Sequence, residues 1–139
     1  MKVNIGEIAL ALFWWFPVYL DLDTGCTFNI RHETDEIVKH KNARKLPLYS
    51  RVPIYQRFLL EKQQQGKIKL GEWFNKYPVF EILPDYEPEE YNVFMVEAQD
   101  TIESFFPEYG SYLDEFMLQF AKDWCEKEGY EWYNRHEGE

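Results

Sequence analysis

The spacing of apolar residues changes along this chain, and that change constrains the fold more than any other feature of the sequence. Between residues 17 and 31, apolar side chains such as Val18, Leu20 and Leu22 alternate with polar ones, which is the pattern of a half-buried strand. In the last third, apolar residues recur at every third or fourth position, as on one side of an amphipathic helix. The two periods occupy separate segments, which predicts an α+β fold.

Helical spacing is found near the N-terminus and dominates the last third of the chain. The segments that we expect to be helical are 4–13, 54–65, 68–77, 91–105 and 113–124, with one or two further turns at 33–39. Pro53 suits the first turn of the second helix and Gly66 its end. Short strands are expected at 79–83 and 130–133.

A turn separates the two alternating runs near the N-terminus. Asp23, Thr24 and Gly25 combine an aspartate that bonds its own downstream backbone with a glycine that accepts positive φ. The sequence therefore predicts a β-hairpin over residues 17–31. The whole chain reads as a single domain, 1–139, with a short N-terminal helix and the hairpin followed by a mainly helical C-terminal part. Its 139 residues, 45% of them hydrophobic, suffice for one packed core.

Cysteine usage and the longest apolar run bear on the compartment. The chain has only Cys26 and Cys125, whereas small secreted scaffolds normally carry more, so we expect free thiols packed as small hydrophobes in a cytoplasmic protein. The apolar run 8–20 is interrupted by Pro17 and is too short to span a bilayer. Asp21 and Asp23 disfavour a signal-peptide cleavage site before Cys26. We expect no membrane association.

Both ends of the chain resemble a family of small, acidic, uncharacterised bacterial proteins. The resemblance rests on the early helix followed by residues 19–25, YLDLDTG, and on residues 120–132, FAKDWCEKEGYEW. Members of that family end in a similar helix, a tryptophan, acidic residues, a glycine and a short apolar tail. The resemblance implies an α+β fold and a bacterial or phage origin, and it implies no activity.

Charge is distributed unevenly within a net charge of −10. Residues 39–69 hold nine basic side chains and one acidic one, whereas residues 70–139 hold four basic and eighteen acidic ones. The basic segment either packs beside the acidic one and neutralises it, or stays exposed as a separate surface. An acidic surface repels nucleic acid and attracts a basic protein.

Our leading hypothesis is a non-enzymatic module that binds a basic protein through an acidic, tyrosine-rich helical surface. The sharpest form of it is an inhibitor or regulator of a nucleic-acid-handling protein, of bacterial or phage anti-defence type. Carboxylates at helical spacing can imitate a run of phosphates. The residues that we predict to form this surface are Asp85, Glu87, Glu89, Glu90, Tyr91, Glu97, Asp100, Glu103, Asp114 and Glu115.

The second hypothesis is a nucleic-acid contact through the basic segment 39–69. Arg44, Lys45, Arg51 and Arg57 would then meet phosphates. Tyrosines interleave with these cations and suit base stacking.

A third hypothesis concerns Asp21 and Asp23, which follow an apolar strand. The pair resembles the first motif of haloacid-dehalogenase-type phosphatases, which implies a small Mg²⁺-dependent hydrolase. The triplet from Asp23 to Gly25 also resembles that of aspartic proteases. An ordinary hairpin turn explains the same residues. The three histidines, His32, His40 and His136, have no metal-ligand spacing, so we predict neither a metal site nor a cofactor.

Overall fold

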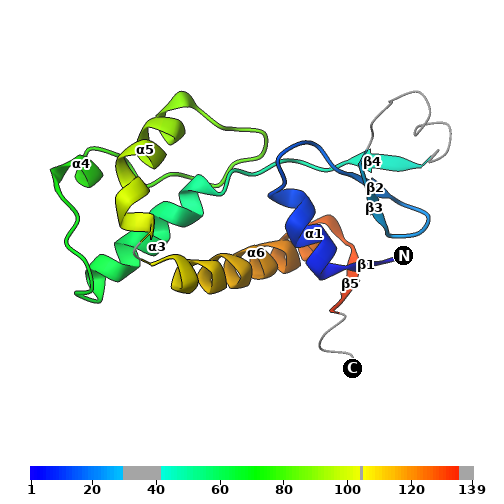
Figure 1. Ribbon diagram of the computed structural model, residues 1–139. Helices are drawn as coiled ribbons and strands as arrows, with labels where there is room; N and C mark the ends of the chain where they lie inside the picture. The colour runs from blue at the N-terminus through cyan, green and yellow to red at the C-terminus, as the bar shows by residue number, and fades with distance from the viewer. Residues whose placement is uncertain (30–41, 104, 135–139) are drawn as a thin grey trace. The chain divides into compact units, whose positions relative to one another are not determined.

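The computed structural model describes residues 1–29, 42–103 and 105–134, without the side chains of residues 100, 102, 103 and 106 (Figure 1). Its contacts group into two compact units. The N-terminal unit comprises residues 1–48 and 117–139, and the helical unit comprises residues 49–116. The α+β fold is confirmed, with a strand-helix-hairpin part followed by a mainly helical part. The helical turns expected at 33–39 fall outside the described residues.

The N-terminal unit contains two small sheets. In the first, β1 (Lys2–Asn4) pairs in parallel with β5 (Glu131–Tyr133), so the two ends of the chain meet in one sheet. In the second, β2 (Tyr19–Asp21) lies between β3 (Thr27–Phe28) and β4 (Ala43–Lys45), antiparallel to both. The expected hairpin and the expected C-terminal strand are therefore confirmed, whereas β1 and β4 were not predicted.

The first helix, α1 (Ile5–Leu12), begins at a side-chain cap. The Asn4 carboxamide oxygen accepts hydrogen bonds from the backbone N–H groups of Gly6 (3.0 Å) and Glu7 (3.4 Å), which satisfies two donors that have no partner within the helix. Ile5, Ile8 and Leu12 are fully buried along one side of α1. Beyond the helix, the Phe13 ring meets the Phe120 ring edge-on at 5.2 Å. The apolar spacing expected for residues 4–13 thus serves core packing.

The helical unit is built from α3 (Val52–Gln64), α4 (Glu72–Asn75), α5 (Glu89–Glu103) and the first half of α6 (Phe106–Glu128). The helix expected at 68–77 is shorter than predicted. The helix expected at 113–124 is longer, because Pro107 suits a first helical turn and lets α6 begin at Phe106. None of the helices in the described ranges contains an apolar stretch long enough to cross a membrane.

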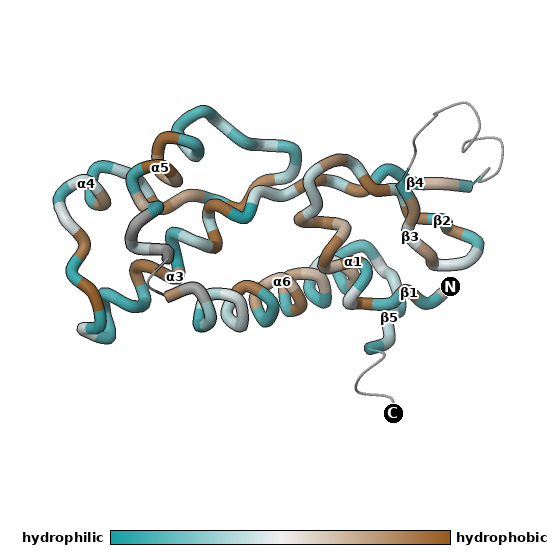
Figure 2. Tube along the Cα trace, viewed as in Figure 1, coloured by the Kyte–Doolittle hydropathy of each residue, from teal (hydrophilic) through white to brown (hydrophobic). Residues whose placement is uncertain are grey.

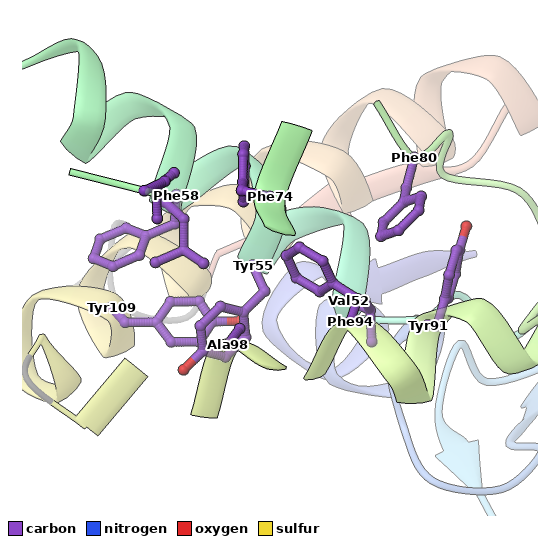
Figure 3. Close-up of a cluster of buried hydrophobic side chains, with 11 residues drawn as sticks. Val52, Tyr55, Phe58, Phe74, Phe80, Tyr91, Phe94, Ala98 and Tyr109 are labelled. Carbon is purple, nitrogen blue, oxygen red and sulfur yellow. The ribbon is translucent and has the colours of Figure 1, made fainter. Parts of the chain in front are cut away.

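Aromatic rings fill the core of the helical unit (Figure 3). Phe94 of α5 is fully buried, and its ring centroid lies 5.3–6.0 Å from those of Trp73, Phe74, Tyr77 and Phe80. Distances in this range suit edge-to-face and tilted ring packing. Because the rings come from α4, α5 and the segment after α4, this cluster holds those elements together.

The side chain of Gln56 bonds the backbone at the start of the segment where a strand was expected, residues 79–83. Residues 79–83 form no strand, and the backbone groups of Pro78 and Phe80 bond a buried side chain of α3. The Gln56 amide nitrogen donates to the Pro78 carbonyl and the amide oxygen accepts from the Phe80 N–H, both at 2.7 Å. Gln56 is only 4% exposed, so it fixes this segment against α3.

Replacing Gln56 with leucine should lower the free energy of unfolding by about 2–4 kcal/mol, because two hydrogen bonds vanish and the buried Phe80 N–H loses its acceptor. Chemical denaturation measures the change. Gln64→Leu, at an exposed position of the same helix, is the matched control and should change stability by no more than about 0.5 kcal/mol. Equal losses in the two variants would show that the Gln56 bonds contribute nothing specific.

Candidate functional site

The solvent-facing side of α5 carries apolar residues beside acidic ones. Glu89, Val93 and Val96 are spaced four and three residues apart, which places them on one side of the helix. Val93 is 48% and Val96 is 73% exposed, and Glu89 is exposed as well. The opposite side of α5 is buried through Tyr91, Phe94 and Ala98. Two valines are therefore presented to solvent on a helix whose core contacts are made by other residues.

Exposed acidic residues lie in the loop before α5 and in its first turn. Asp85 and Glu87 lie in the loop that leads into the helix, and Glu90 lies in its first turn. Figure 2 shows this loop as largely hydrophilic. Between the two loop carboxylates, Tyr86 is 48% exposed, and its ring packs edge-on against the Tyr91 ring at 6.0 Å. Acidic residues in a first turn also suit the positive end of the helix dipole, so part of this charge stabilises α5 itself.

Glu97 and Tyr91, both predicted for the acidic surface, have partners within the helical unit. The Glu97 carboxylate accepts hydrogen bonds from the Lys76 ammonium and the Tyr77 hydroxyl, both at 2.8 Å. These bonds, the Lys76 bond first, lower the pKa of Glu97, and burial together with the bond to Glu97 raises the pKa of Tyr77 to about 12. Tyr91 is 2% exposed and donates to the Glu81 carbonyl. Both side chains therefore make contacts within the helical unit.

The remaining predicted acidic residues lie at other positions. Asp114 and Glu115 are adjacent and exposed on the first half of α6. Asp100 and Glu103 belong to α5, but their side chains fall outside the described part of the chain. The predicted acidic residues whose described side chains are exposed thus lie in the loop before α5, in the first turn of α5 and on the first half of α6.

The basic segment is divided between the two units and is partly neutralised. In the N-terminal unit, the Arg44 guanidinium pairs with the Glu128 carboxylate at 3.2 Å and donates to the Tyr130 hydroxyl at 2.7 Å. It also lies 5.2 Å from the centre of the Trp124 ring, a distance suited to a cation–π contact. In the helical unit, Lys62 pairs with Glu108 and lowers the pKa of that carboxyl.

Among the other residues of the nucleic-acid hypothesis, Lys45 is exposed in the N-terminal unit, whereas Arg51 and Arg57 belong to the helical unit. The Arg57 guanidinium donates to the Pro53 carbonyl one turn earlier at 3.1 Å. The four predicted phosphate contacts, Arg44 included, are therefore shared between two separate units.

Asp21 acts as a cap for the hairpin loop. It is 8% exposed, and its carboxylate accepts from the backbone N–H groups of Asp23 (2.8 Å) and Thr24 (3.3 Å), as in an Asx turn. The Asp23 carboxylate accepts from the Asn42 amide at 3.2 Å. Within the described residues, no group of three or more His, Cys, Asp or Glu side chains could hold a metal ion. His32, His40 and His136 fall outside those residues.

The two cysteines differ in their surroundings. Both are free thiols, as expected. Cys125 is fully buried, and burial raises the pKa of its thiol to about 11, so its role as a small hydrophobe is confirmed. The expectation that Cys26 packs in the same way is wrong, because Cys26 is exposed. Its N–H bonds the Thr24 hydroxyl and its carbonyl bonds the Asp21 N–H, which places the residue in the loop, ahead of β3.

No family model, curated protein or solved structure matches this chain. The resemblance of the chain ends to a bacterial family therefore stays a prediction, and any function has to be argued from the chain's own residues.

Val93 and Val96 are the surface residues that the sequence analysis missed. The buried residues of α5 follow the predicted apolar stripe through Tyr91, Phe94 and Ala98. The two valines are apolar but lie off this stripe. That departure from the pattern is the sequence signal that could have identified them as exposed apolar residues. An apolar residue on the solvent side of an amphipathic helix has no core to enter.

Proposed function

We propose that this protein is a non-enzymatic module that binds a basic protein through the solvent-facing side of α5, which carries Glu89, Val93 and Val96. We call this the acidic side of α5, because acidic residues of the preceding loop and of its first turn adjoin it in the sequence. The observation that carries the proposal is the exposure of Val93 and Val96 next to Glu89 on a helix already anchored by its other side. Protein interfaces combine apolar contacts at the centre with polar or charged residues at the rim. A helix with apolar residues at this spacing is a common element of such contacts.

Charge indicates the kind of partner. The helical unit holds thirteen acidic and six basic residues, a net charge of −7. Glu97 and Glu108 are paired internally. Glu87 and Glu89 are exposed, and so is Asp85. A basic surface would be attracted to this side of α5, and opposite charges raise association rates more than they raise affinity. A regulator or inhibitor of a nucleic-acid-handling protein is the sharpest form of the proposal, because such proteins carry basic surfaces.

The test is capture of a bacterial protein by the tagged chain, with and without nuclease and over a range of salt concentrations. We expect a basic protein that survives nuclease and is lost as salt rises, because salt screens exposed charges. The double variant Glu89→Gln, Glu90→Gln should weaken capture about tenfold or more. The control Glu126→Gln, Glu131→Gln removes two exposed charges from the N-terminal unit and should leave capture unchanged.

Three outcomes would contradict the proposal: equal capture by both double variants, binding that does not respond to salt, or capture that disappears with nuclease. The last result would favour a nucleic-acid contact instead. Substituting Arg57 and Lys45 separately would then show which unit makes that contact, because the two residues belong to different units.

A further inference from the structure

A small pocket lies within the helical unit, between α3, α4 and the segment after α4. Its volume is about 180 Å³. Sites for drug-sized ligands and cofactors are larger, roughly 300–1,000 Å³. The size fits a short side chain or a small organic acid.

The walls of the pocket are mainly apolar. Leu60 of α3, Phe74 of α4, the Tyr77 ring and Val79 line it. Phe74 is buried in the core, whereas Val79 is 67% exposed at the edge. The Tyr77 hydroxyl is already bonded to Glu97. An aliphatic group can therefore leave water by packing against these walls.

The position of Val79 is fixed by the residues on either side of it. The Gln56 amide bonds the Pro78 carbonyl and the Phe80 N–H, so the backbone on both sides of Val79 is fastened to α3. Gln56 also lines the pocket, and each of its two polar atoms already makes one of these bonds. It therefore supports the wall of the pocket. The other lining residues that could bond a polar group without breaking a bond of this wall are Asn75 and Arg57.

Arg57 is the charged residue of the pocket. One of its terminal nitrogens donates to the Pro53 carbonyl, and a guanidinium carries four further N–H groups. Within the described part of the chain, Arg57 makes no ion pair, whereas Arg44, Lys62 and Lys76 each pair with a carboxylate. Guanidinium groups bind carboxylates through paired hydrogen bonds.

We propose that this pocket binds a short aliphatic carboxylate, with the chain against Leu60, Phe74 and Val79 and the carboxylate on Arg57. A free small acid and the carboxyl end of a peptide with an apolar last residue share this chemistry. The proposal goes beyond the acidic side of α5 and uses none of its residues. It assigns the helical unit a second binding site of opposite charge preference.

The test is an NMR titration of the ¹⁵N-labelled protein with 4-methylpentanoate and with its uncharged analogue, 4-methylpentanamide. We expect the acid to shift backbone resonances of residues 56–60 and 74–79 and to bind at least about tenfold more tightly than the amide, because only the acid forms charge-assisted hydrogen bonds. Arg57→Gln should abolish that preference. Lys69→Gln, which removes an exposed charge in the same unit, should retain it.

Equal binding of acid and amide would overturn the proposal, and so would an acid preference that persists in Arg57→Gln, or the absence of shifts around the pocket with every probe. A second titration separates the two sources of the carboxylate, using an acetylated tripeptide that ends in leucine with a free or an amidated carboxyl end. Shifts with the free-ended peptide assign the site to peptide carboxyl ends. Shifts with 4-methylpentanoate alone assign it to a free acid. The Glu89→Gln, Glu90→Gln variant should bind both probes normally, so the two proposals can fail separately.

Discussion

Replacing Gly25 with alanine should destabilise the protein by at least about 3 kcal/mol. Gly25 has a φ of +80°, and a Cβ atom added there would lie 2.3 Å from the Lys2 carbonyl oxygen. Positive φ alone costs an alanine roughly 1–2 kcal/mol. The contact adds a larger cost, because the carbonyl belongs to the backbone of β1 and cannot rotate away as a side chain would. Either β1 or the hairpin loop has to move.

Gly129 provides a matched control for this substitution in the same unit. Its φ is also +80°, but an added Cβ would meet nothing within 4 Å. Gly129→Ala should therefore cost only the conformational part, about 1–2 kcal/mol. Urea denaturation followed by tryptophan fluorescence measures both variants. The difference between them isolates the approach of the hairpin loop to β1, and equal losses would show that this approach is not tight in solution.

The contact at Gly25 also shows where prediction from the sequence ends. Alternation and the Asp-Thr-Gly turn were enough to predict the hairpin, because strand period and turn chemistry are local properties. The pairing of β1 with β5 joins the two ends of the chain through three-residue strands. Three residues are too few to establish a period, and no local signal indicates the partner of a parallel strand. The fold class could therefore be predicted, but the sheet topology could not.

The candidate site, like the fold, could be predicted from the sequence only in part. Acidic residues can be located in a sequence, and Asp85, Glu87 and Glu89 are exposed as an acidic surface requires. Whether a carboxylate is available depends on its tertiary partners. Glu97 is bonded by Lys76 and Tyr77, residues about twenty positions earlier in the chain. The pocket beside Arg57 has the same origin, since it exists only where α4 and the segment after it pack against α3.

Phe94→Ala is expected to have the other large effect on stability, a loss of about 3–5 kcal/mol. The ring is fully buried, and four other aromatic rings lie within 6.0 Å of its centroid. Its removal leaves a cavity and eliminates ring–ring contacts, each worth about 0.5–1.5 kcal/mol beyond burial. Urea denaturation and near-ultraviolet circular dichroism would report the loss. Phe94→Leu keeps part of the volume and should lose less, which gives a measurable value if the alanine variant does not fold.

Val96→Ala is the control on the same helix, two residues further on. Val96 is 73% exposed, so its truncation should change stability by no more than about 0.5 kcal/mol. A loss below about 1.5 kcal/mol in Phe94→Ala would mean that the aromatic cluster is loosely packed. In the capture assay the order should reverse. Under the proposed function, Val96→Ala should weaken binding of a basic partner while the protein stays folded, because α5 buries one side in its own core and leaves the other exposed.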